Sequence, residues 1–113
     1  EAHLNTTIGA VLTDAPLTKA QAKRLALAGH DGIARAVRPA HSPLDGDTLF
    51  AAATGKVGET SASTAGTAPG VDAEVLASLS AAAADAVEAA IVDAVVNAAP
   101  GLGLEAYSSL LSC

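Results

Sequence analysis

The sequence predicts a fold of helices and strands, because two strand-like stretches alternate along the chain with two helix-like stretches. Residues 6–13 (TTIGAVLT) are rich in β-branched side chains and lead into an Asp-Ala-Pro turn, a pattern typical of a strand. Thr18 and Gln21 have capping-box spacing, which predicts that a helix begins there. Asp72 stands before a long alanine-rich stretch and is suited to cap a second helix.

The first helix is predicted to run from residue 18 to about residue 37 and to end before Pro39, which cannot continue a helix. The second strand is predicted over residues 48–54 (TLFAAAT), although alanine is a poor strand former. Small side chains dominate the predicted inward face of the first helix, which suits close approach to another element. That face consists of Leu25, Ala28, Gly32 and Ala36.

The second half of the chain is predicted to contain a loop, a long helix and a tail. Residues 55–71 are rich in Gly, Ser and Thr and are predicted to form a mobile surface loop. The helix is predicted from residue 72 to about residue 98, before Pro100, and the tail is predicted to dock through Tyr107 and Leu110. The apolar side of this helix is predicted to hold Leu76, Leu79, Ala83, Val87, Ala90, Ile91 and Ala94.

The core is predicted to be thin. Half of the 113 residues are apolar, but 29 of them are alanines, and the chain has one Phe, one Tyr and no Trp or Met. Burying a Leu or Ile side chain stabilises by roughly 1.5–3 kcal/mol, and an alanine methyl group contributes much less. Two strands also cannot form a closed sheet. Because the chain begins with Glu1 rather than Met, we expect packing against an upstream segment, and we expect the isolated chain to aggregate or stay largely unfolded.

Charge is unevenly distributed along the chain, whose net charge is −6. All six basic residues lie in the segment from Lys19 to Lys56, and every charged residue after Lys56 is acidic. No dense basic patch with interleaved aromatic residues is present in the sequence, so nucleic acid is not an expected partner. Two interpretations remain open: the charges form two solvated helix faces of opposite sign, or these faces help to orient subunits.

The sequence does not favour secretion or a membrane span. Cys113 is the single cysteine, so no internal disulfide can form, and no signal peptide is recognisable. We therefore expect a cytoplasmic protein. The apolar stretch 81–99 contains regularly spaced polar residues, which argue against a membrane-spanning helix. These residues are Asp85, Glu88, Asp93 and Asn97.

Three motifs together point to one enzyme family. They are Asn5-Thr6-Thr7-Ile8-Gly9, the helical segment His30-Asp31-Gly32 with Ala34-Arg35-Ala36, and Asp45-Gly46-Asp47-Thr48. In this order and spacing, residues 4–55 closely resemble the β-subunit region of the L-aminopeptidase/D-esterase-like hydrolases, which include the nylon-oligomer hydrolases. The resemblance resumes weakly in the alanine-rich helix and the Glu105-Ala106-Tyr107 tail.

The resemblance implies self-cleavage between Asn5 and Thr6, with Thr6 as the nucleophile. It divides the chain into residues 1–5, the end of an α-part, and residues 6–113, the β-subunit region. A threonine hydroxyl needs a base, and the α-amine that cleavage would create on the same residue can serve as one. Taken alone, Thr6 and Thr7 would simply open a strand.

Asp45 and Asp47 are candidate catalytic residues besides Thr6. The resemblance to the nylon-oligomer hydrolases implies that both belong to the catalytic site and accept hydrogen bonds from the threonine hydroxyl or amine. Residues two apart on an extended chain point to the same face. An ordinary Asp-Gly turn is one alternative. A Ca²⁺ or Mg²⁺ site is another, but two carboxylates fall short of the oxygens that Ca²⁺ requires, so we expect no metal and no cofactor. His30 and His41 are interpreted as structural.

The resemblance further implies an α+β fold, a four-layer α-β-β-α sandwich completed by the upstream α-part, and homo-oligomers of αβ units. It implies that a lysine and an asparagine of the active site lie in the α-part. The leading hypothesis is hydrolysis of linear oligoamides or short peptides through an acyl-enzyme on Thr6. The alternatives are an aminopeptidase or esterase of the same family, and a non-catalytic assembly subunit.

Overall fold

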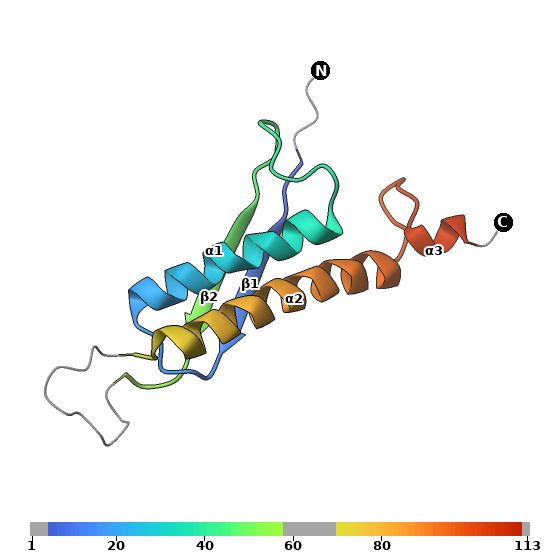
Figure 1. Ribbon diagram of the computed structural model, residues 1–113. Helices are drawn as coiled ribbons and strands as arrows, with labels where there is room; N and C mark the ends of the chain where they lie inside the picture. Colours follow the sequence, from blue (N-terminus) through green and yellow to red (C-terminus); the bar gives the residue numbers. More distant parts are fainter. Residues whose placement is uncertain (1–4, 58–69, 112–113) are drawn as a thin grey trace, which may run out of the picture.

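The expected elements are present in the expected order (Figure 1). The computed structural model describes residues 5–57 and 70–111. Most of the loop predicted over residues 55–71 lies outside these ranges. The α+β class is confirmed. The elements are strand β1 (Ile8–Thr13), helix α1 (Lys19–Ala36), strand β2 (Thr48–Ala53), helix α2 (Ala73–Asn97) and the short helix α3 (Tyr107–Leu110).

Both long helices begin at the predicted caps. The Thr18 hydroxyl accepts a hydrogen bond from the Gln21 amide at 3.2 Å, and the Gln21 side chain accepts one from the Thr18 amide at 3.2 Å, which confirms the capping box. The Gln21 side chain also donates to the Val71 carbonyl at 2.7 Å. Asp72 caps α2 by accepting from the Val75 amide at 2.8 Å. Gln21 therefore ties the start of α1 to the segment that leads into α2.

The two strands pair in parallel, with Ile8 opposite Thr48 and Thr13 opposite Ala53. Helix α1 connects them, and both long helices lie against the same face of the sheet (Figure 1). Side chains alternate between the two faces of a strand. No element in the described part of the chain covers the outer face, and its Ile8, Leu12 and Phe50 are 71%, 77% and 61% exposed.

Glycines let α1 approach its neighbours closely. A Cβ added at Gly32 would overlap the Ala84 carbonyl oxygen and lie 2.8 Å from the Val87 Cβ. A Cβ at Gly29 would lie 2.9 Å from the Leu49 Cδ1. Helix α1 is thus packed between α2 on one side and β2 on another. At Gly32 the obstacle is the α2 backbone, so only a residue without a side chain fits there, whereas at Gly29 the Leu49 side chain would have to move.

The buried face of α1 differs in part from the prediction. Leu25 and Gly32 are buried as expected, whereas Ala28 and Ala36 are only partly buried. Gly29 and Ile33 are buried as well. The buried residues still form one helical stripe, but this stripe is rotated around α1 relative to the predicted one, because α1 contacts both β2 and α2. On α2 the buried residues are Ala83, Ala84 and Val87.

The predicted docking of the tail through Tyr107 and Leu110 was wrong, because these side chains are 45% and 60% exposed. Ala106 is buried instead. Helix α3 contacts α2 and lies at the far end of that helix, beyond the sheet (Figure 1).

The two charge regions of the sequence meet on the surface of the helix pair. The Arg35 guanidinium of α1 lies 2.9 Å from the Asp85 carboxylate of α2. The two side chains are 48% and 75% exposed, and exposed ion pairs of this kind contribute at most about 1 kcal/mol. The ion pair therefore contributes little to the stability of the helix pair.

By length and composition alone, α2 could cross a membrane, and it is the only helix in the described part of the chain that could. Helices that form the core of a protein can meet the same criteria. Here Ala83, Ala84 and Val87 of α2 are buried, and Asp85 on the same helix pairs with Arg35. The expectation that this stretch does not span a membrane stays a prediction.

Candidate active site

The Asn5–Thr6 junction lies beside the segment that leads into β2. Asn5 forms a parallel bridge with Asp45, and the Gly46 amide donates to the Asn5 carbonyl at 2.8 Å. A Cβ added at Gly46 would lie 3.2 Å from the Thr6 hydroxyl oxygen, so glycine permits this close approach. The parallel pairing of the strands therefore continues backwards to the junction and brings together residues that are 40 positions apart.

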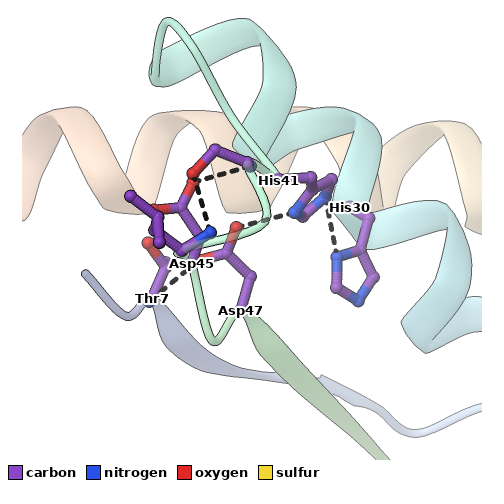
Figure 2. A network of polar contacts seen from close by, with 7 residues as sticks. Thr7, His30, His41, Asp45 and Asp47 are labelled. Atoms are coloured by element: carbon purple, nitrogen blue, oxygen red, sulfur yellow. Dashed lines mark hydrogen bonds and ion pairs between the residues drawn. The ribbon is translucent and has the colours of Figure 1, made fainter. Parts of the chain in front are cut away.

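Asp47 fixes the start of β1 (Figure 2). Its Oδ1 accepts a hydrogen bond from the Thr7 amide at 3.0 Å, and its Oδ2 lies 2.6 Å from Nδ1 of His41. The Asp47 side chain is only 7% exposed. In this chain, in which Asn5 is still joined to Thr6, Asp47 binds the amide of the residue after the candidate nucleophile.

Asp45 organises the loop itself. Its Oδ2 accepts from the Ser42 amide at 2.8 Å, and its own amide donates to the Ser42 carbonyl at 3.0 Å (Figure 2). These reciprocal bonds close a tight turn between the two residues. Asp45 therefore shapes the loop that presents Gly46 and Asp47 to the junction.

The pKa of Asp47 lies below its ordinary value of 3.8. Burial raises this pKa, but the hydrogen bonds from His41 and from the Thr7 amide, together with the charge of His41, lower it by more. The carboxylate is consequently ionised at neutral pH. An ionised oxygen is also the stronger hydrogen-bond acceptor, which matches the short contact with His41.

This lowered pKa predicts a dependence of stability on acid pH. A carboxylate with a lower pKa in the folded state stabilises the fold above its unfolded pKa. This contribution is lost as the pH falls from about 4 through the lowered value. We expect Asp47→Asn to lower the melting temperature of the full-length protein most at neutral pH, and the difference from the wild type to narrow below about pH 4. Asp31→Asn, at an exposed position on α1, controls for the lost charge. A difference in melting temperature between Asp47→Asn and the wild type that stays constant from pH 7 to pH 2 would contradict the prediction.

A groove of about 550 Å³ begins at Thr6 and follows β1. Its lining includes the consecutive residues 6–12, so it runs along the edge of the strand and not along one face. The opposite wall is formed by α2, mainly by Ala86, Ala90, Ile91, Ala94 and Val95. The edge of β1 that does not pair with β2 therefore borders an open, largely apolar channel.

The structure thus gathers the four residues that the sequence predicts for the site: Asn5, Thr6, Asp45 and Asp47. Sequence reasoning missed the connection of His41 to Asp47, which lies six residues later. A histidine shortly before a candidate catalytic aspartate was the available signal. Within residues 5–57 and 70–111, no group of three or more His, Cys, Asp or Glu residues could hold a metal ion.

Comparisons with known proteins identify relatives of this chain. An uncharacterized aminopeptidase of Mycobacterium bovis is 43% identical over 106 residues, which are 94% of this chain and 31% of that protein. An uncharacterized aminopeptidase of Mycobacterium leprae is 43% identical over 107 residues, 95% of this chain and 30% of that protein. A 6-aminohexanoate-oligomer endohydrolase of Paenarthrobacter ureafaciens is 36% identical over 53 residues, 47% of this chain and 15% of that protein.

The chain spans 31% of the length of the first of these relatives. No solved structure matches it significantly. The family model described as peptidase family S58 matches residues 1–107, nearly the whole chain. The resemblance found in the sequence is confirmed, both to aminopeptidases and, more distantly, to the oligomer endohydrolases. The chain therefore belongs to peptidase family S58.

Proposed function

We propose that the protein containing this chain is an amide hydrolase that cuts its own backbone between Asn5 and Thr6 and then uses Thr6 as an N-terminal nucleophile. The main support for the proposal is that the Asn5–Thr6 junction lies against residues 45–47, in a chain that belongs to a peptidase family. An unperturbed α-amine has a pKa near 7.7–8, which suits a general base at neutral pH.

In the self-cleavage step, the Thr6 hydroxyl oxygen attacks the carbonyl carbon of Asn5. The hydroxyl proton passes to the Thr6 nitrogen, the Asn5–Thr6 amide bond breaks, and the nitrogen leaves as the neutral α-amine of Thr6, while an ester joins Asn5 to the Thr6 side chain. Water then hydrolyses the ester. The Gly46 amide already donates to the Asn5 carbonyl at 2.8 Å, so it is placed to stabilise the negative charge that develops on that oxygen.

In turnover, the freed Thr6 amine accepts the proton of its own hydroxyl as that oxygen attacks the amide carbonyl of a substrate. The amine half of the substrate leaves with a proton, and water releases the acyl half from Thr6. Asp47 holds the Thr7 amide at 3.0 Å, one residue from Thr6, and in this proposal keeps the nucleophile in place. Asp45 maintains the loop that carries Asp47.

The incomplete sheet supports the proposal of an upstream α-part. Ile8, Leu12 and Phe50 leave the outer sheet face apolar and exposed, and large exposed apolar patches mark interaction sites. The groove along β1 leaves a strand edge uncovered, which natural proteins avoid. An upstream part that adds strands beside β1 and a second sheet over the outer face would complete a four-layer α-β-β-α sandwich. Such αβ units would then assemble into oligomers.

The position of the cut tests the proposal directly. We expect intact-mass measurement of the purified full-length protein to show two chains, the second of which begins at Thr6. N-terminal sequencing of that chain should read Thr-Thr-Ile-Gly. An active protein that stays uncut, or that is cut at another bond, would refute self-cleavage at this junction.

Aminopeptidase activity is the second candidate. The mycobacterial relatives named as aminopeptidases match 94–95% of the chain, whereas the endohydrolases match 47%. The two activities differ in their need for a free substrate amine. An endohydrolase is expected to cut an N-acetylated oligoamide or peptide at a rate comparable to that of the free form, and an aminopeptidase is expected to leave it intact. Chromatography of the products with both forms distinguishes them.

A further inference from the structure

A line of hydrogen-bonded side chains connects helix α1 to the start of β1 (Figure 2). His30 of α1 lies with its Nδ1 3.1 Å from Nε2 of His41, and the two rings are tilted by 53° with centroids 4.9 Å apart. The Nδ1 of His41 lies 2.6 Å from Asp47, which in turn holds the Thr7 amide at 3.0 Å. The line ends one residue from Thr6.

Proton positions along this line are fixed by the carboxylate at its end. Asp47 is ionised and can only accept, so Nδ1 of His41 must donate to it. When His41 is neutral, its Nε2 carries a lone pair and accepts from Nδ1–H of His30. When His41 is protonated, the direction of that last bond reverses. In either case a single proton lies between the two rings, and the His41 ring is held from both sides.

The backbone at His41 is shaped for this contact. Its φ is +57°, in the left-handed region that is uncommon for residues other than Gly, although Asn, Asp and His are found there more often than other residues. A residue with a Cβ accepts this conformation only where surrounding contacts hold it. The contacts of the His41 ring with Asp47 and His30 stabilise this conformation.

We propose that His41 is a positioning residue that acts through Asp47 to place Thr6, with His30 fixing the orientation of the His41 ring. The inference rests on the proposed function, because it assumes that Thr6 is the nucleophile. Without the bond from His41, the Asp47 carboxylate is free to rotate away from the Thr7 amide. The start of β1 then loses its anchor, and misplacement of a reacting group by about 1 Å can slow a reaction on the order of 100-fold.

A matched pair of variants separates the hydrogen bond from the backbone conformation. Asn and Gly both tolerate positive φ, but only Asn offers an N–H near the position of Nδ1. In the full-length protein we expect His41→Asn to keep self-cleavage and kcat within roughly 3-fold of the wild type. We expect His41→Gly to lower both on the order of 10- to 100-fold, with a smaller change in KM. His30→Leu should give an intermediate loss. Self-cleavage is followed by intact mass, kcat with an oligoamide substrate, and folding by thermal melting.

Equal activities of the Asn and Gly variants would overturn the inference, as would a loss in His41→Gly that is confined to KM. A Gly variant that melts far below the Asn variant would be compared again at a temperature where both are folded, and equal kcat values there would likewise overturn the inference. Thr6→Ala, measured alongside, separates the two proposals. If Thr6→Ala still cleaves itself and hydrolyses amides, the proposed function fails, and the inference fails with it. If Thr6→Ala is inactive and the two His41 variants are alike, only the positioning role of His41 fails.

Discussion

Replacing Thr6 with alanine is expected to leave the full-length protein uncut and to lower its rate of amide hydrolysis on the order of 10⁴-fold or more, because loss of a catalytic nucleophile has effects of this size in other hydrolases. The alanine removes the hydroxyl that attacks Asn5 and, after cleavage, the substrate. Thr6→Ser retains a hydroxyl and should still cleave. Intact mass reports the cut, and product formation from an oligoamide reports turnover.

Thr7→Ala is the matched control, because it removes the neighbouring hydroxyl but keeps the backbone amide that Asp47 holds at 3.0 Å. It should cleave itself like the wild type. If Thr6→Ala hydrolyses amides as fast as the wild type, Thr6 is not the nucleophile. If the wild type also stays uncut and inactive, the non-catalytic assembly subunit becomes the better interpretation.

Gly32→Val is expected to lower the free energy of unfolding of the full-length protein by about 3 kcal/mol, at the upper end of typical overpacking effects. A Cβ at this position would overlap the Ala84 carbonyl oxygen and lie 2.8 Å from the Val87 Cβ and 2.9 Å from the Glu88 amide nitrogen. Two of these three atoms belong to the α2 backbone, which cannot rotate away as a side chain can. The helices must therefore separate.

Ala34→Val is the control for this prediction. It places the same β-branched side chain in α1, but at an exposed position. It should cost only the intrinsic helix propensity of valine relative to alanine, about 0.6 kcal/mol. Denaturant unfolding of both variants gives the comparison. Equal losses for Gly32→Val and Ala34→Val would mean that the contact between α1 and α2 is looser than the structure shows.

The members of the candidate site were predictable from the sequence, but their contacts were not. The motifs around Thr6 and Asp47 named the residues through a family resemblance, which the family match confirms. The hydrogen bond between Asp47 and the Thr7 amide was not predictable. It depends on the parallel register of β1 and β2, which continues back to Asn5 and Asp45. The positive φ of His41 was not predictable either, because no sequence pattern around it indicates one.

The sequence by itself determined the types, order and limits of the main elements. Caps, prolines and side-chain periodicity act over a few residues, so Thr18 and Asp72 fixed the helix starts without help from the rest of the chain. Only the tertiary structure decided that Gly29 and Ile33 are buried while Tyr107 stays exposed. Burial depends on what packs against each surface, and α1 is covered by both β2 and α2, whereas the tail meets only the end of one helix.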